Sequence, residues 1–312
     1  MKENNSPQSG APVSIKNTNN LTLILEYGII WDFQKLPEKS IALDGSVMGP
    51  KIDTNKKIYS FDHHGNCVRH ASSATCVQVL DAVLLGLDPY GFNIYINDLD
   101  ADTMLSYTLL KYPELAQLEK VQNIVRAVGL LDAHGPAYPL NEKIKQKIDF
   151  LLYNIFESAE NLRTNRDYSK KNLKNILLKC TANFIQWVEE GFPIKINSLE
   201  RGYKIYPKTG KDWIMVNSEN YVFDLIYNDG YTKAVSWQLL ADGSFSYTIG
   251  KKSEFVDFPV KEILEHLNSV ESGWGGGSTI GGAPRNTDGS RSKIQPEKLV
   301  LIINDFLLKI KL

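Results

Sequence analysis

The sequence has few cysteines, little net charge and no long apolar run. Its 312 residues include three cysteines, Cys67, Cys76 and Cys180, without C-x-x-C spacing. This odd number fits a reducing compartment better than a disulfide framework, so we expect a cytoplasmic protein. The formal net charge of −1 argues against a protein that coats long nucleic acid through bulk positive charge.

The chain also lacks the about 18 consecutive apolar residues that a membrane helix needs, so we expect no membrane partner. Its first 20 residues are polar and contain no apolar signal core, which indicates a disordered tail over residues 1–20. The length allows two domains with substantial cores. A change of composition near Gly191 predicts domains over residues 21–195 and 203–312, with the boundary between Gly191 and Lys204.

The first half alternates short apolar runs with helical patterns, which is typical of an α/β fold. We therefore expect a mostly parallel sheet with helices on both faces. The expected strands are Leu21–Leu25, Ser40–Leu43, Ile58–Phe61 and Phe92–Ile96. The expected helices are Ala74–Leu85, Thr103–Lys111, Leu118–Leu131, about Glu142–Arg163 and about Lys170–Glu190.

The C-terminal part has a different pattern, with strands expected at Trp213–Val216, Lys233–Leu240 and Ser244–Ile249. Ala241-Asp242-Gly243 predicts a hairpin between the last two. Helices are expected at Val260–Ser269 and about Pro296–Lys309. This order predicts a smaller α+β domain.

The most informative stretch is Phe61-Asp62-His63-His64-Gly65, which follows an expected strand. It places Asp62, His63 and His64 at a strand end, where open α/β sheets bind ligands. Taken alone, such a histidine pair is more often solvent-facing or hydrogen-bonded. The segment Ala71–Thr75 then opens a helix with Ser and Thr at capping positions, where free backbone N–H groups can bind an anion.

A second cluster carries Asp98, Asp100 and Asp102 at another strand end. Like charges this close raise one another's pKa unless a cation is present, and divalent metals accept carboxylate with imidazole ligands. The alternative is a solvated acidic turn that caps a helix. Asp44 after a strand and Asp132 after an apolar run are weaker candidates, because LDG and LDA sequences are common in turns.

A glycine-rich segment, Glu271–Arg285, lies inside the C-terminal domain. Dense glycine allows a backbone to approach a ligand and to form an anion-binding nest, whereas a Gly/Ser run between domains indicates a flexible linker. The guanidinium groups of Arg285 and Arg291 could hold phosphate in bidentate fashion. The predicted substrate-binding residues here are Gly275, Gly276, Gly277, Ser278 and Arg285.

Together these motifs resemble the DHH phosphoesterase superfamily. The stretch Ser60–Leu84 resembles the DHH signature, and D-x-D-A-D-x-x-x-S from Asp98 to Ser106 resembles the family's acidic motif. The glycine-rich segment resembles the loop of the C-terminal domain that accompanies DHH. In the family the acidic motif precedes DHH, whereas here it follows. The resemblance therefore implies a rearranged or circularly permuted catalytic sheet.

The resemblance implies a two-metal phosphoesterase that uses two Mn²⁺ ions, with Mg²⁺ or Co²⁺ as alternatives. It gives Asp62, His63 and His64 catalytic roles and places His64 against the substrate phosphate. Asp44 would bridge the metals and Asp98 would replace a family histidine. The implied metal ligands are Asp44, His63, Asp98, Asp100, Asp102 and Asp132.

The expected substrate is short: a nucleotide, a dinucleotide, a small phosphoester or a short oligonucleotide. A homodimer is compatible with the sequence. One alternative is a RecJ-type single-strand exonuclease, which the near-neutral charge disfavours. Another is a catalytically silent nucleotide sensor, which the intact His63, His64, Asp100 and Asp102 disfavour.

Overall fold

The computed structural model describes residues 19–310 except 66, 69, 136–137, 156–166, 192–200, 208–209, 211 and 287–288. Its contacts divide the chain into two compact units, residues 1–196 and 197–312. The predicted boundary between Gly191 and Lys204 includes residues 192–200, which lie outside the described part. Residues 1–18 of the predicted tail lie outside it as well.

The first unit is built on a five-stranded sheet with the order β1-β5-β2-β4-β3. Four strands run parallel: β1 (Thr22–Leu25), β5 (Asn93–Ile96), β2 (Ser40–Leu43) and β4 (Ile58–Phe61). The prediction of a mostly parallel sheet is thereby confirmed. The edge strand β3 (Lys51–Asp53) runs antiparallel to β4 and was not predicted, because two of its three residues are charged.

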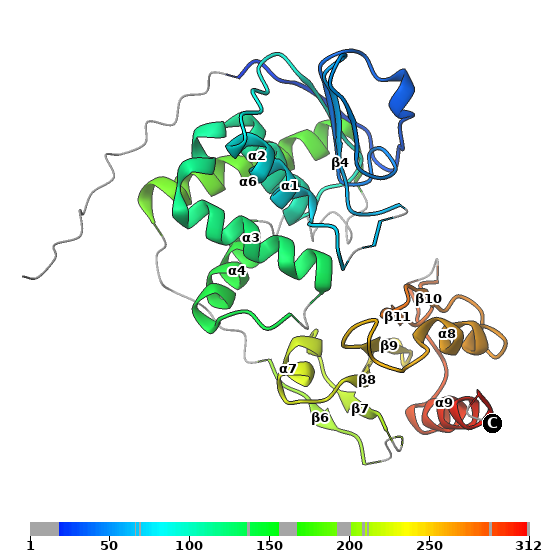
Figure 1. Ribbon diagram of the computed structural model, residues 1–312. Coiled ribbons are helices and arrows are strands. Elements are labelled where there is room, and N and C mark those ends of the chain that lie inside the picture. The colour runs from blue at the N-terminus through cyan, green and yellow to red at the C-terminus, as the bar shows by residue number, and fades with distance from the viewer. Residues whose placement is uncertain are drawn as a thin grey trace, which may run out of the picture. The chain divides into compact units, whose positions relative to one another are not determined.

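Helices pack against one face of this sheet. In Figure 1, α1 lies next to α2, α3 and β4, and each of these pairs is in contact. The helix expected to reach Arg163 is described only to Asn154, because residues 156–166 lie outside the described part. The helices are α1 (Thr75–Leu84), α2 (Ala101–Lys111), α3 (Glu119–His134), α4 (Glu142–Asn154) and α6 (Lys170–Glu190), with a 3₁₀ helix at Pro113–Gln117.

The two faces of the sheet have different coverings, because successive strand residues point to opposite sides. Ile41 and Ile94 join the core shared with the helices. Among the described residues, Ala42 and Tyr95 on the other face pack with Phe33 and Leu36, around the 3₁₀ helix η1 (Phe33–Lys35). The expectation of helices on both faces is corrected here, because the β1–β2 connection forms only this short turn of helix.

The second unit has a six-stranded, mainly antiparallel sheet with the order β10-β11-β9-β8-β7-β6. The expected hairpin at Asp242-Gly243 is confirmed, since β8 and β9 pair antiparallel on either side of it. Its strands are β6 (Lys204–Ile205), β7 (Ile214–Asn217), β8 (Lys233–Leu239), β9 (Phe245–Lys251), β10 (Gly275–Gly276) and β11 (Ile280–Gly282). Its helices are α7 (Phe223–Asn228), α8 (Val260–Asn268) and α9 (Pro296–Ile310).

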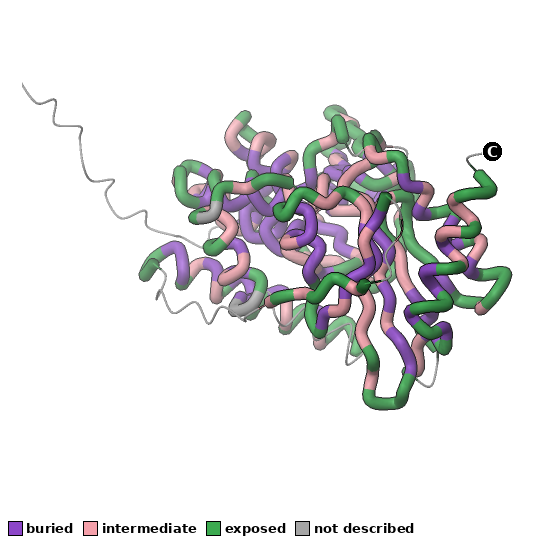
Figure 2. Tube along the Cα trace, turned by 90° about the horizontal axis from the view of Figure 1, so that it is seen from below, coloured by how far each residue is buried: buried purple, intermediate pink, exposed green. Residues whose placement is uncertain are grey.

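The core of the second unit joins its sheet to α8 and α9. Ile249 of β9 is buried with Leu264 of α8 and Ile303 of α9. In Figure 2 the last helix, which ends at the C label, has both buried and exposed positions, as expected for an amphipathic helix. Within the described residues, neither unit contains a helix long and apolar enough to cross a membrane.

Candidate metal centre

Three parallel strands of the first unit end at one edge of the sheet, and each leads into a candidate residue. β2 leads into Asp44, β4 leads into Asp62 and His63, and β5 leads into Asn97. The Asn97 Nδ2 donates a hydrogen bond to the backbone oxygen of Gly45 at 3.0 Å. This bond joins the loops that follow β5 and β2, so the carboxyl edge of the sheet is held together where a ligand site is expected.

His63 lies at the centre of a group of carboxylates. Its Nε2 is 2.8 Å from Oδ2 of Asp132, 3.5 Å from Oδ1 of Asp44 and 3.8 Å from Oδ2 of Asp102. The side chain is fully buried. Among the described residues, neither ring nitrogen has a partner in hydrogen-bond geometry. Buried polar atoms are normally satisfied, so a buried imidazole that faces three carboxylates without hydrogen-bond geometry fits a metal ligand.

The ligand atoms form two overlapping groups, each with all its atoms within 4.8 Å of one another. One contains Asp44, His63 and His64, and the other contains His63, Asp102 and Asp132. A ring nitrogen has one lone pair and binds one ion. The Nε2 of His63 can therefore ligate a metal in only one of the two groups. Imidazole combined with carboxylate suits a divalent transition metal such as Mn²⁺.

Asp102 connects the site to the start of α1. Its carboxylate oxygens accept hydrogen bonds from the backbone N–H groups of Thr75 at 2.9 Å and Cys76 at 2.6 Å. The expected Ser/Thr cap is wrong, because Ala74 occupies the N-cap position and no side chain there caps the helix. The anion at this helix start is a residue of the chain itself, and it fixes Asp102 beside His63.

Asp44 has an unusual backbone and two hydroxyl partners. Its φ of 46° lies in the left-handed region, which Asp tolerates better than most residues. Its Oδ1 accepts a hydrogen bond from the Thr75 hydroxyl at 3.1 Å, and its Oδ2 accepts one from the Thr103 hydroxyl at 3.3 Å. Sequence reasoning missed both threonines; their positions at the first turns of α1 and α2, directly after the motifs, were the available signal.

The charges of the cluster are strongly coupled. Burial disfavours the imidazolium of His63, but the carboxylates of Asp132 and Asp44 outweigh it and raise the pKa of His63 to about 9. Burial and the charges of Asp44 and Asp132 raise the pKa of Asp102 to about 7. Burial opposes ionisation of Asp44, yet His63 and His64 bring the pKa of Asp44 well below its usual range. The cluster therefore attracts positive charge.

Asp62 holds the neighbouring loop and His64 in place. Its carboxylate accepts hydrogen bonds from the backbone N–H groups of Gly45, Gly49 and His64, at 2.9, 2.7 and 2.9 Å. The Nδ1 of His64 is also 2.9 Å from Oδ1 of Asp62. The side chain of Asp62 is fully buried and belongs to neither metal group. These contacts are those of a positioning residue, and the expected catalytic role of Asp62 stays a prediction.

His64 is exposed and has two carboxylate neighbours. Besides Asp62, the Oδ1 of Asp44 lies 3.3 Å from its Nδ1. Contacts with Asp44 and Asp62 raise the pKa of His64 to about 10 against the effect of burial. A protonated imidazole whose Nδ1 faces the carboxylates leaves Nε2–H as the second donor.

Two of the expected metal ligands belong to neither metal group. The Oδ1 of Asp100 accepts a hydrogen bond from the Thr103 N–H at 2.8 Å and caps α2. Burial, with the charges of Asp44, Asp102 and Asp132, raises the pKa of Asp100. Asp98 is exposed, and its Oδ1 accepts a hydrogen bond from the Leu99 N–H at 2.7 Å. The sequence left open whether these aspartates bind metal or cap a helix, and the hydrogen bond of Asp100 is that of a helix cap.

The glycine-rich segment forms a hairpin in place of an open loop, with β10 paired to β11. A Cβ at Gly276 would lie 2.2 Å from Cα of Gly281, and one at Gly281 would lie 2.3 Å from Cδ1 of Leu264. Packing therefore explains these two glycines, whereas a Cβ at Gly275 would have nothing within 4 Å. The Ser278 hydroxyl donates a hydrogen bond to the Glu254 carboxylate.

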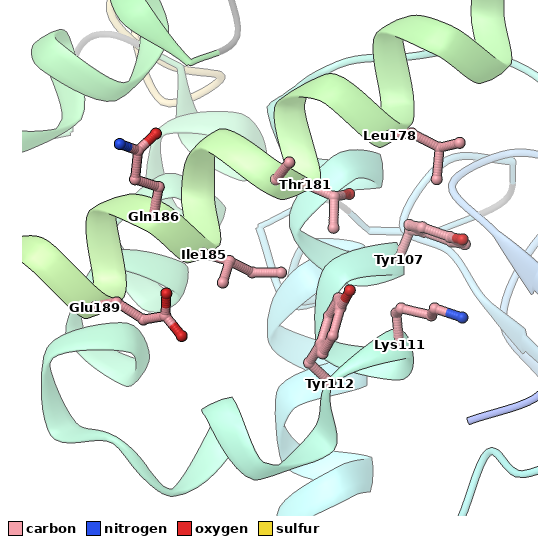
Figure 3. A pocket seen from close by; sticks show the side chains of 9 residues that line it. Tyr107, Lys111, Tyr112, Leu178, Thr181, Ile185, Gln186 and Glu189 are labelled. Carbon is pink, nitrogen blue, oxygen red and sulfur yellow. The ribbon is translucent and has the colours of Figure 1, made fainter. Parts of the chain in front are cut away.

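Away from the metal centre, a cavity of about 260 Å³ lies between α2 and α6. Figure 3 shows Tyr107 and Lys111 on one side and Leu178, Thr181 and Ile185 on the other. It adjoins the C-terminal end of α2, whereas Asp100 and Asp102 lie at the N-terminal end. Its lining supplies none of the groups that could hold a metal among the described residues. The sheet-edge cluster therefore remains the candidate site.

No protein-family model matches this chain, and no curated protein matches it.

Proposed function

We propose that this protein is a divalent-metal-dependent phosphoesterase of DHH type, acting on a short phosphorylated substrate in the cytoplasm. The observation that carries the proposal is the buried His63, whose Nε2 lies within 3.8 Å of carboxylate oxygens of Asp44, Asp102 and Asp132. These residues come from two strand ends and two helices. Such convergence at the carboxyl edge of a parallel sheet supports a catalytic centre.

The residues proposed to hold two Mn²⁺ ions are Asp44, His63, Asp102 and Asp132, all members of the two metal groups. Bound there, divalent cations supply positive charge against phosphoryl oxygens and lower the pKa of water to near neutral. Each carboxylate oxygen of Asp44 accepts a hydrogen bond from a threonine hydroxyl, which fixes the orientation of the carboxylate that would bind metal. Asp102 is fixed by two backbone N–H groups, which limits the reorganisation needed on binding.

His64 is proposed to contact the substrate phosphate. Its ring is exposed at the edge of the cluster, with Nδ1 held by Asp62. The remaining Nε2–H can donate to a phosphoryl oxygen, and the contact with Asp62 favours the protonated ring. Asp62 fixes the orientation of this ring.

The hairpin of the second unit is proposed, from its resemblance to the domain that accompanies DHH, to carry substrate-binding residues. Gly275 and Gly277 have space around them that packing does not require. Ser278 follows these glycines in the turn between β10 and β11. Arg285 is exposed and lies after β11. Arg285→Ala should raise KM more than it lowers kcat, because the guanidinium would bind the ground state and the transition state alike.

The test is hydrolysis of a substrate panel by purified, Mn²⁺-loaded protein. The panel contains a phosphomonoester, a dinucleotide and a long single strand. We expect the short substrates to be cleaved, and His63→Ala to remove turnover while wild-type activity stays dependent on metal. Preference for the long strand with strong salt dependence would favour the exonuclease. Nucleotide binding without any turnover would favour the silent sensor.

A further inference from the structure

A cavity of about 270 Å³ lies between the start of α1 and α3. On both helices, a lining residue is next in sequence to a residue of the metal centre or one that contacts it. On one wall Ala74 precedes Thr75, whose hydroxyl lies 3.1 Å from Asp44. On the other wall Ala133 follows Asp132. Successive Cα atoms are about 3.8 Å apart, so a group in this cavity can belong to the same small molecule as a phosphoryl group at the centre.

Several residues that line the cavity have small side chains or none. Ala71, Ala74, Gly129 and Ala133 line it. A Cβ at Gly129 would lie 2.5 Å from Cγ2 of Val77, so α1 and α3 are in close contact there. The cavity is thus lined in part by small apolar residues of two closely packed helices, and its volume is just below the about 300–1,000 Å³ of ordinary ligand pockets. It suits one ring system rather than an extended chain.

Two histidine rings line the cavity. The rings of His70 and His134, both lining residues, are 5.7 Å apart in an edge contact. The ring of His134 stacks on Tyr138 with centroids 5.2 Å apart and an interplanar angle of 21°. Bases stack on such rings in many nucleotide-binding proteins. The hydroxyl-bearing Ser72 and Ser73 also line the cavity and offer hydrogen bonds to a ring edge.

The charges favour a neutral ring over a second phosphate. Arg126 is the cationic residue that lines the cavity. Its Nη2 is 2.8 Å from Oδ1 of Asp81, so its charge is compensated by an ion pair. A second anion would therefore find little uncompensated positive charge.

We propose that this cavity binds a planar nucleobase, so that the substrate is a nucleotide or dinucleotide rather than a sugar phosphate. The inference rests on the proposed function, which places the phosphoryl group at the adjoining centre. His134 is its main stacking residue.

The test is equilibrium binding of AMP and of ribose 5-phosphate to the full-length, Mn²⁺-loaded protein, since both ligands carry the ribose and the phosphate and only AMP carries a base. We expect AMP to bind about tenfold more tightly, equivalent to about 1.4 kcal/mol. Equal affinities would overturn the inference, and this comparison needs no variant. His134→Ala should remove most of the preference and His134→Phe should keep it, because phenylalanine retains the ring.

His266→Ala is the matched control. The His266 ring also stacks on an aromatic ring, that of Phe306 at 4.9 Å, but it lies on α8 of the second unit. This variant should keep the preference for AMP; loss of the preference in it as well would contradict a role for the α1–α3 cavity.

Failure of the inference and failure of the proposed function give different results. Mn²⁺-dependent hydrolysis together with equal binding of AMP and ribose 5-phosphate would leave the function standing and remove the base subsite. The metal-free protein tests the subsite alone, through adenosine against ribose. A preference for adenosine that His134→Ala removes would support the subsite even if no metal binds, and no preference in either experiment would overturn it.

Discussion

The Nε2 of His63, just after β4, lies 2.8 Å from Oδ2 of Asp132 in the last turn of α3. This contact joins the sheet edge to a helix that reaches it only in the folded chain. His63 is fully buried, while the side chain of Asp132 is 29% exposed. The pair therefore places one ligand inside the protein and one at the border with solvent, as a site open to substrate requires.

Asp132→Asn and Asp98→Asn are a matched pair of variants. They distinguish the metal ligands indicated by the structure from those expected from the sequence motif. Asp132 belongs to a metal group, whereas Asp98 does not. We expect Asp132→Asn to weaken Mn²⁺ binding at least about tenfold, since it removes an anionic ligand, and Asp98→Asn to change it little. Isothermal titration calorimetry measures both. Equal weakening would return Asp98 to the ligand set expected from sequence.

The positioning role of Asp62 predicts a large loss of stability in Asp62→Ala. The substitution leaves the N–H of Gly49 and its neighbours without their acceptor, and each buried orphan donor costs about 1–3 kcal/mol. We expect a loss of at least about 2 kcal/mol in the free energy of unfolding, measured by urea denaturation.

Asp53→Ala is the control for that experiment. The Asp53 carboxylate also accepts two backbone N–H bonds, from Asn55 and Lys56 at 3.0 Å, but at an exposed turn. Water can replace the carboxylate there, so the loss should stay below about 1 kcal/mol. Similar losses in the two variants would show that Asp62 is not a buried anchor.

Local patterns predicted four of the five strands and most helices of the first unit. The apolar runs ending at Leu43, Phe61 and Ile96 are β2, β4 and β5, because burial between neighbouring strands requires such runs. The covering of the second face was not predictable in this way. Phe33 and Leu36 lie in a short 3₁₀ segment, whose few residues show no helical period.

The candidate site was predictable in composition but not in detail. The pairing of His63 with Asp132 depends on how α3 packs against α1, which no short motif encodes. The cap of α1 shows the same limit: Ser72 and Ser73 have the preferred chemistry, yet Asp102 from another helix binds the N–H groups.

Gly276→Ala and Gly275→Ala test the packing of the glycine hairpin. Gly276 has a φ of 155°, and a Cβ there would lie 2.5 Å from the Ile280 oxygen. Because those atoms are backbone, the hairpin must shift, and we expect a loss of about 1–3 kcal/mol. Gly275→Ala meets open space and should cost under about 1 kcal/mol. Thermal denaturation measures both; equal effects would mean that β10 and β11 are not paired this closely.

The cysteines provide a chemical test of the first unit. Cys76 and Cys180 are buried, and Cys67 is half-buried. Burial raises the pKa of Cys180 to about 11 and the pKa of Cys76 well above its usual value. Because the thiolate is the reactive form, both should resist iodoacetamide even at pH 9 until the protein is denatured, while Cys67 is labelled first. Rapid labelling of Cys180 in the native protein, located by mass spectrometry, would contradict the packing of α6.

The most direct test of the central claim is the rate of dinucleotide hydrolysis during titration of metal-free protein with Mn²⁺. A metal site made of Asp44, His63, Asp102 and Asp132 predicts activity that is absent without metal and levels off at about two ions per chain. Activity that does not depend on Mn²⁺, or no hydrolysis when two ions are bound, would contradict it.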